Sequence, residues 1–132
     1  KHVLKSMKEH KSGSIIFFGS AHMDYGEIDR AAYALTKSSL NTLSTHIAHH
    51  YAKYGIRSNY LVMGWTNTEG ELELRKSEGV SEKELQQKAS AILPMGRMLN
   101  TFDPVPAVMY FISDQSAMTT GSIMRITGGE YI

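Results

Sequence analysis

Tyr33 and Lys37 lie four residues apart in the segment AAYALTKSSL, whose composition favours a helix. Residues at positions i and i+4 of a helix lie one above the other on the same face, so the Lys37 ammonium can approach the Tyr33 phenol. An isolated phenol, with a pKa of about 10, exchanges its proton poorly at neutral pH. A cation held within about 4–6 Å favours the phenolate, as proton transfer to or from a substrate oxygen requires. The pair is therefore a candidate for acid–base chemistry, and two ordinary residues on one helical face are the alternative.

Further polar groups are expected near this pair because of where they fall along the chain. Ser20 precedes Tyr33 by thirteen residues and stands at the end of the apolar segment SIIFFGS. Gly64, Thr66 and Thr68 close or follow a second predicted strand, IRSNYLVMG. Ligands of open parallel sheets bind beyond the carboxyl ends of the strands, and a glycine there lets the backbone approach a ligand closely. Three segments thus converge on one candidate site, which a Tyr-x-x-x-Lys match by itself does not predict.

The sequence predicts alternating strands and helices that would hold these residues in place. Short, continuously apolar segments predict buried strands, and apolar residues at three- and four-residue spacing predict helices. The expected strands cover residues 14–20, 56–64 and 122–126. The first expected helix ends before Gly13, and the others cover residues 30–54, 68–77, 81–93 and 103–113. Asp29 is expected to cap the long helix. This alternation predicts the α/β class, with about three parallel strands, right-handed crossovers and helices on both faces.

Composition and charge argue against several classes of function. The chain of 132 residues has a formal net charge of +1 and scattered basic residues, so neither nucleic acid nor an anionic membrane is expected as a partner. It contains no cysteine, which excludes disulfides and thiolate chemistry and leaves the cytoplasm as the default compartment. His46 and His50 lie one helical turn apart, but the sequence offers no further ligand beside them, so no metal site is predicted.

Five segments, taken in order, resemble the short-chain dehydrogenase/reductase family. GSIIFFGS is similar to the strand that carries the family's catalytic serine, here Ser20, and YALTK is similar to its Tyr-x-x-x-Lys. GIRSNYLVMGWTNT resembles a strand and loop in which Gly64 and Thr68 match the family, whereas Met63 replaces its usual proline. LPMGRM and FISDQSAMTTGSIMRITGG resemble the Leu-Gly-Arg segment, the Ser-Asp helix end and the last strand. The likeness covers the whole chain, which resembles the carboxyl-terminal part of a Rossmann-like, doubly wound domain.

The resemblance implies an NAD(P)-dependent oxidoreductase that moves a hydride between nicotinamide and a small alcohol or carbonyl compound. Tyr33 would exchange the proton of the substrate oxygen while it contacts both substrate and cofactor. Lys37 would favour the phenolate and hold the ribose of the nicotinamide. Ser20 would donate a hydrogen bond to the substrate oxygen and stabilise its developing charge.

The same resemblance assigns secondary roles to several other residues. Gly64, the backbone near Thr66 and the Thr68 hydroxyl would contact the nicotinamide carboxamide. His22 would line the substrate mouth or lie in a surface loop, and residues 66–100 would form a helical insertion that covers the substrate or a simple solvated pair of helices. The family usually forms homodimers or homotetramers through its long helix and last strand, so a homo-oligomer is expected.

The amino-terminal features of the family are not found in this sequence. No Gly-x-x-x-Gly-x-Gly follows a strand, and the Asn-Ala-Gly strand and the catalytic asparagine are missing. The chain begins KHVLKSMKEH, already in helical rhythm, so we expect those features to precede Lys1. Two hypotheses follow. The chain is the catalytic half of an oxidoreductase and is inactive alone, or it is a catalytically silent module that self-associates or binds a partner.

Overall fold

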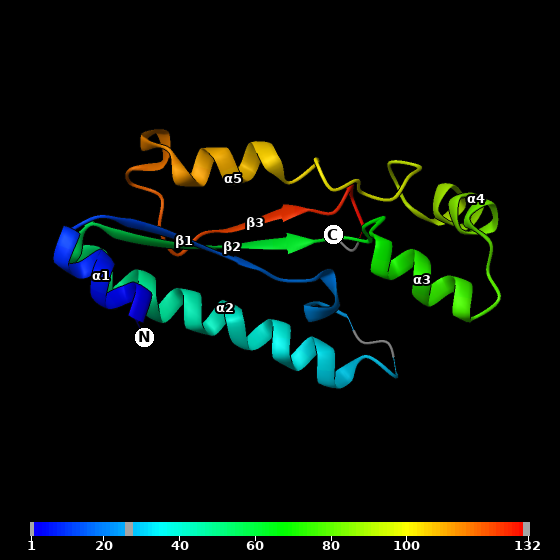
Figure 1. Ribbon diagram of the computed structural model, residues 1–132, viewed down its shortest axis with the longest axis horizontal. Coiled ribbons are helices and arrows are strands. Elements are labelled where there is room, and N and C mark those ends of the chain that lie inside the picture. Colours follow the sequence, from blue (N-terminus) through cyan, green and yellow to red (C-terminus); the bar gives the residue numbers. More distant parts are fainter. Residues whose placement is uncertain (1, 26–27, 131–132) are drawn as a thin grey trace.

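Three parallel strands form the centre of the protein, whose computed structural model describes residues 2–25 and 28–130 (Figure 1). The strands are β1 (Gly13–Phe18), β2 (Ile56–Met63) and β3 (Ile123–Ile126), arranged in the order β1-β2-β3. β2 pairs with a neighbour on both sides, and most of its residues are buried. A strand with both faces covered is expected to be rich in apolar residues. β2 fits this in its second half, residues 60–63, whereas Arg57, Ser58 and Asn59 in its first half are polar.

Helices cover both faces of this sheet, as the sequence predicted. The helices are α1 (His2–His10), α2 (Ala31–Tyr51), α3 (Glu69–Ser77), α4 (Glu82–Ile92) and α5 (Val105–Ile112). Figure 1 shows α2 along one face and α5 along the other, whereas α3 and α4 lie beyond the carboxyl end of β2. No helix in the described part of the chain has the length and apolarity needed to cross a membrane.

The long helix ends where the sequence predicted but begins without the expected cap. α2 continues into a 3-10 turn, Ala52–Tyr54, and stops at Gly55, whose φ is 69°. A side chain at Gly55 would also place its Cβ 2.4 Å from the carbonyl oxygen of Lys11, so glycine is required there. The prediction that Asp29 caps the helix was wrong. The N-cap is Arg30, whose side chain makes no capping hydrogen bond, because the helix starts one residue later.

Two apolar clusters hold the helices in place. Ala21, Tyr60 and Val62 form the core between the sheet and α2, where Phe17 and Leu40 pack against them. A separate cluster of Leu85, Ala89, Leu93 and Met98 lies beneath α4, with Trp65, Leu72 and Val80 around it. The second cluster attaches the α3–α4 segment to the loop that follows β2, so this segment has its own core beside the sheet.

Arg57 joins the central strand to the carboxyl end of α5. Its Nη1 donates hydrogen bonds of 2.6 Å to the carbonyl oxygen of Phe111 and to Ser116 Oγ, and Nη2 donates to the carbonyl oxygen of Ser113. Ser14 Oγ of β1 donates to the same Phe111 carbonyl at 2.8 Å. Carbonyls in the last turn of a helix lack partners within the helix, and a cation also complements the helix dipole at that end.

Replacement of Arg57 by lysine should therefore destabilise the fold. A lysine ammonium cannot reproduce the planar fork that serves three acceptors, so we expect the free energy of unfolding to fall by about 2 kcal/mol. Urea unfolding followed by circular dichroism measures this change. Arg97→Lys is the matched control, because Arg97 pairs with Asp103 with 55% of its side chain exposed and should lose less than about 1 kcal/mol. Equal losses in the two variants would contradict the role of Arg57.

Candidate active site

A cleft of about 550 Å³ lies at the carboxyl ends of the first two strands. The residues that line it come from the β1–α2 loop, the first turn of α2, the loop after β2, and α3 and α4. Six of the seven residues predicted as a site from the sequence are among them: Ser20, His22, Tyr33, Gly64, Thr66 and Thr68. Lys37 does not line the cleft and lies one helical turn beyond Tyr33.

Ser20 is buried at the start of the β1–α2 loop, with 7% of its surface exposed. It is the N-cap of the short 3-10 helix Ala21–Met23, and its Oγ accepts a hydrogen bond from the backbone N–H of His22 at 3.3 Å. This bond uses a lone pair of the hydroxyl and fixes its orientation. The hydroxyl proton has no acceptor among the residues that the structure describes, so Ser20 can donate to an oxygen that enters the cleft.

Tyr33 and Lys37 are neighbours on α2, as the spacing predicted. Lys37 Nζ lies 5.7 Å from the centroid of the Tyr33 ring and donates a hydrogen bond of 3.1 Å to the carbonyl oxygen of Phe18, the last residue of β1. The ammonium therefore ties the helix to the strand that leads to Ser20. Tyr33 is 43% exposed, which leaves its ring accessible from the cleft.

His22 packs between two tyrosine rings at the wall of the cleft. Its ring stacks on Tyr25 with a centroid distance of 5.2 Å and meets Tyr33 edge-on at 5.8 Å. Nδ1 of His22 is buried, without a hydrogen-bond partner in the described structure. His22 therefore lines the cleft, and its predicted contact with substrate stays a prediction.

The loop after β2 is shaped by contacts within the protein. A Cβ at Gly64 would lie 2.8 Å from Thr127 Cα and from Glu130 Oε2, so only glycine fits there. Thr66 Oγ1 donates to the Gly64 carbonyl at 2.9 Å, and Thr68 Oγ1 caps α3 by accepting from the Glu71 N–H at 3.2 Å. Each threonine keeps some hydrogen-bonding capacity. The Thr66 hydroxyl can still accept through its lone pairs, and the Thr68 hydroxyl can still donate its proton.

A hydrogen-bonded network of charged residues forms the far wall of the cleft, and sequence reasoning missed it. Trp65 Nε1 and Arg75 Nε both donate to Glu71 Oε1, at 2.7 and 2.8 Å. Arg75 also pairs with Glu78 at 2.9 Å, and the backbone N–H of Trp65 donates to Glu130 Oε2 at 2.7 Å. Burial raises the pKa of the Glu71 carboxyl, but the hydrogen bonds from Trp65 and Arg75 outweigh it and hold that pKa below its ordinary value. The only sequence signal was the spacing of Glu71 and Arg75 on one helix face.

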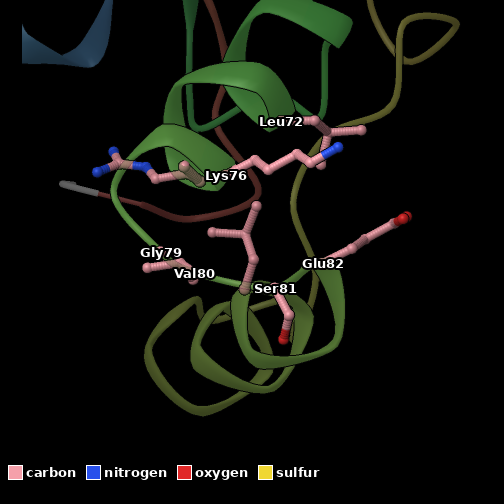
Figure 2. A pocket seen from close by; sticks show the side chains of 8 residues that line it. Leu72, Lys76, Gly79, Val80, Ser81 and Glu82 are labelled. Atoms are coloured by element: carbon pink, nitrogen blue, oxygen red, sulfur yellow. The ribbon is translucent and has the colours of Figure 1, made fainter.

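A second cavity, of about 410 Å³, lies between α3 and α4 and is shown in Figure 2. Leu72 and Lys76 of α3 face Val80, Ser81 and Glu82 across it. None of the predicted site residues lines this cavity. Of these two cavities, the cleft that holds Ser20 and Tyr33 is therefore the better candidate for chemistry, because the predicted site residues line it.

Within residues 2–25 and 28–130, no group of three or more His, Cys, Asp or Glu side chains is arranged to hold a metal ion. His46 and His50 stack with a centroid distance of 5.8 Å, and His49 meets His50 edge-on on the exposed surface of α2.

Comparison with known proteins identifies the family to which the chain belongs. A family model described as Enoyl-(Acyl carrier protein) reductase matches residues 1–130. The chain belongs to the short-chain dehydrogenase/reductase family. A 7alpha-hydroxysteroid dehydrogenase of Paraclostridium sordellii is 32% identical over 98% of this chain and 46% of its own length. The 2-(S)-hydroxypropyl-CoM dehydrogenase 3 of Xanthobacter autotrophicus is 31% identical over 98% of this chain and 50% of its own.

Solved structures of short-chain dehydrogenases share this fold. A family member from Francisella tularensis matches with a TM-score of 0.85 and 26% identity, over 98% of this chain and 56% of that one. Actinorhodin polyketide ketoreductase matches with a TM-score of 0.86 at 24% identity, over 96% of this chain and 50% of that one, which is a likeness of fold alone. The expected Rossmann-type parallel sheet is thus confirmed. The chain spans about half the length of the curated relatives given above.

The Glu71 network should make stability depend on pH. Because the folded-state pKa of Glu71 is depressed, its ionised form stabilises the fold above the ordinary value of 4.5, and this contribution is lost as the pH falls through the folded-state value. We expect Glu71→Gln to lower the free energy of unfolding at about pH 7 and to lose less of it than the parent between about pH 6 and pH 3.

Chemical unfolding at several pH values measures this difference. Glu73→Gln is the matched control, since Glu73 is an exposed residue of the same helix and its replacement should leave the pH profile parallel to that of the parent. A parallel profile for Glu71→Gln would contradict the assignment.

Proposed function

We propose that this short-chain dehydrogenase/reductase chain carries the acid–base half of an NAD(P)-dependent oxidoreductase. The reaction would transfer a hydride between nicotinamide and an alcohol or carbonyl carbon. The observation that carries the proposal is the convergence of Ser20 and Tyr33 in one cleft, with Lys37 on the next turn of the same helix. The names of the relatives, a hydroxysteroid dehydrogenase and a hydroxypropyl-CoM dehydrogenase among them, support the same class of chemistry.

The residues present fit the nicotinamide end of NAD or NADP. Lys37 does not line the cleft and donates one N–H to the Phe18 carbonyl, so its other N–H groups are those that would bind ribose hydroxyls. The backbone near Thr66, close to Gly64, and the Thr68 hydroxyl would offer groups to a carboxamide. Similar folds have been solved with NADP, in a gluconate 5-dehydrogenase, and with NAD, in a 3-oxoacyl-[acyl-carrier protein] reductase. When bound, the nicotinamide supplies or accepts the hydride.

In this proposal, the residues of the chain handle the substrate oxygen and its proton. Ser20 donates its uncommitted O–H to the oxygen and stabilises the charge that develops on it. Tyr33 gives the proton during reduction and takes it during oxidation. Lys37 Nζ, 5.7 Å from the centroid of the Tyr33 ring, places a positive charge beside that ring.

We propose a small polar alcohol or ketone as the substrate. Charged side chains of α3 and α4, among them Arg75, Glu78 and Lys88, line the cleft together with Ile92. Their position supports a covering role for residues 66–100. A polar lid of this kind favours a substrate with more than one hydrogen-bonding group.

Exposed apolar side chains favour self-association as an additional property. Leu35 and Leu43 of α2 are 72% and 47% exposed, and Ile123 of β3 is 47% exposed. We propose a cytoplasmic homodimer or homotetramer that uses these elements. The silent, self-associating module remains the alternative function, because the same exposed surface would serve it.

Replacement of Tyr33 by phenylalanine tests the proton-transfer role. In the complete encoded protein, assayed by nicotinamide absorbance with a panel of secondary alcohols and ketones, we expect kcat to fall by about 10²–10⁴-fold. Cofactor affinity should change by less than about twofold, because the ring is kept. Tyr51→Phe, at the other end of α2, is the matched control and should retain full activity. A Tyr33→Phe enzyme with unchanged kcat would exclude the proposed role, and a parent protein without any turnover would favour the silent module.

The 132 residues by themselves should bind nicotinamide cofactors weakly. They contain no Gly-x-x-x-Gly-x-Gly turn, whose backbone N–H groups would bind the pyrophosphate. Titration with NADH and NADPH, followed by nicotinamide fluorescence, should therefore show no saturation in the micromolar range. Micromolar affinity would mean that this chain holds the cofactor without the glycine-rich turn.

A further inference from the structure

Tyr60 is a fully buried polar residue in the middle of β2, directly beneath the candidate active site. Its exposed fraction is 0%, and its side chain belongs to the core cluster between the sheet and α2. The hydroxyl donates a hydrogen bond of 2.8 Å to the main-chain carbonyl oxygen of Lys37. A carbonyl inside a helix already has a helical partner, so the fold does not need this bond to satisfy α2.

Gly19 makes room for the Tyr60 ring next to Ser20. A Cβ at Gly19 would lie 1.9 Å from Tyr60 Oη and 2.0 Å from Cζ, so the ring fills the space in which the side chain before Ser20 would stand. The Gly19 N–H donates to the Leu61 carbonyl at 2.7 Å, which holds this backbone against β2. The Tyr60 hydroxyl therefore lies between the backbone that carries Ser20 and the helical turn that carries Lys37.

The hydroxyl stays protonated and keeps its role as a donor. Burial raises the pKa of Tyr60, a hydrogen bond from the Ser20 backbone lowers it in part, and the nearby Tyr33 and Asp24 raise it further. Ser20 follows β1 and Tyr33 belongs to α2, so the residues that affect this pKa lie on both sides of the Tyr60 hydroxyl.

We propose that Tyr60 is a positioning residue that sets the distance between Ser20 and the Tyr33–Lys37 pair. Its ring spaces the strand end from α2, and its hydroxyl fixes the turn of α2 at Lys37. A second tie, from Lys37 Nζ to the Phe18 carbonyl, fixes the side chain of the same lysine. The inference rests on the proposed function, because it assumes that Ser20 and Tyr33 act on one substrate oxygen with Lys37 beside Tyr33.

Tyr60→Phe tests the proposal because it keeps the ring and removes only the hydroxyl. In the complete encoded protein we expect kcat to fall by about 10–100-fold, since small misplacements of reacting groups are costly, while substrate KM changes by less than about twofold. Tyr110→Phe is the matched control. The Tyr110 hydroxyl also makes one partly buried hydrogen bond, of 2.9 Å to Thr119 Oγ1. Tyr110 belongs to α5 and does not line the cleft. An unchanged kcat in Tyr60→Phe, or an equal fall in Tyr110→Phe, would overturn the proposal.

Amide hydrogen exchange provides a readout that does not depend on activity. In Tyr60→Phe, exchange should become several-fold faster in the turn of α2 that follows Lys37 and at residues 19–22, and should stay unchanged in α5. If the parent protein shows no turnover, the proposed function fails, and exchange alone decides the positioning role. Local acceleration would support that role, and exchange identical to the parent would overturn it.

Discussion

Parallel pairing of β1 with β2 sets Phe18 opposite Leu61, and the candidate site depends on this register. The pairing extends past the end of β1 through the hydrogen bond from the Gly19 N–H to the Leu61 carbonyl, so the backbone is still fixed at the residue before Ser20. Because both strands end at one edge of the sheet, the loops that carry Ser20 and Gly64 open on the same side. A slip of one residue would turn every side chain of β1 to the opposite face and would remove Ser20 from the cleft.

Buried polar groups in this protein fall into two kinds. Asn59 and Ser58 in β2 have complete partners: Asn59 bonds the backbone at Thr119 and Ser122, and the Ser58 hydroxyl bonds Ser44 of α2 at 2.9 Å. Such groups hold elements together, since an unpaired buried polar atom is costly. Ser20 differs, because its hydroxyl proton has no acceptor among the described residues. An uncommitted donor at the carboxyl end of a parallel sheet fits a group that is kept available for a ligand.

Local patterns made most of the fold predictable. Apolar runs marked the strands, and the four-residue spacing of Tyr33 and Lys37 required only helix geometry. The α2 cap was mispredicted because the helix begins at Ala31, one residue later than expected, so that Arg30 and not Asp29 is the N-cap. The contacts of Arg57 with Phe111 and of Trp65 with Glu130 join residues more than fifty positions apart. No periodicity encodes such pairs, because they depend on which loops the folded sheet brings together.

The Gly19–Tyr60 contact shows why the candidate site extends beyond its recognisable motif. Tyr60 pairs with Phe17 in the sheet register, and position 19, just past the end of β1, lies on the same face as Phe17. The volume absent at Gly19 is thus taken up by a side chain of the neighbouring strand, which adds a hydroxyl at the base of the site. The two positions are coupled, since a larger residue at 19 can be accommodated only with a smaller one at 60. The geometry of the Tyr-x-x-x-Lys helix therefore depends on a pair of residues that lies outside the motif and is shared between two strands.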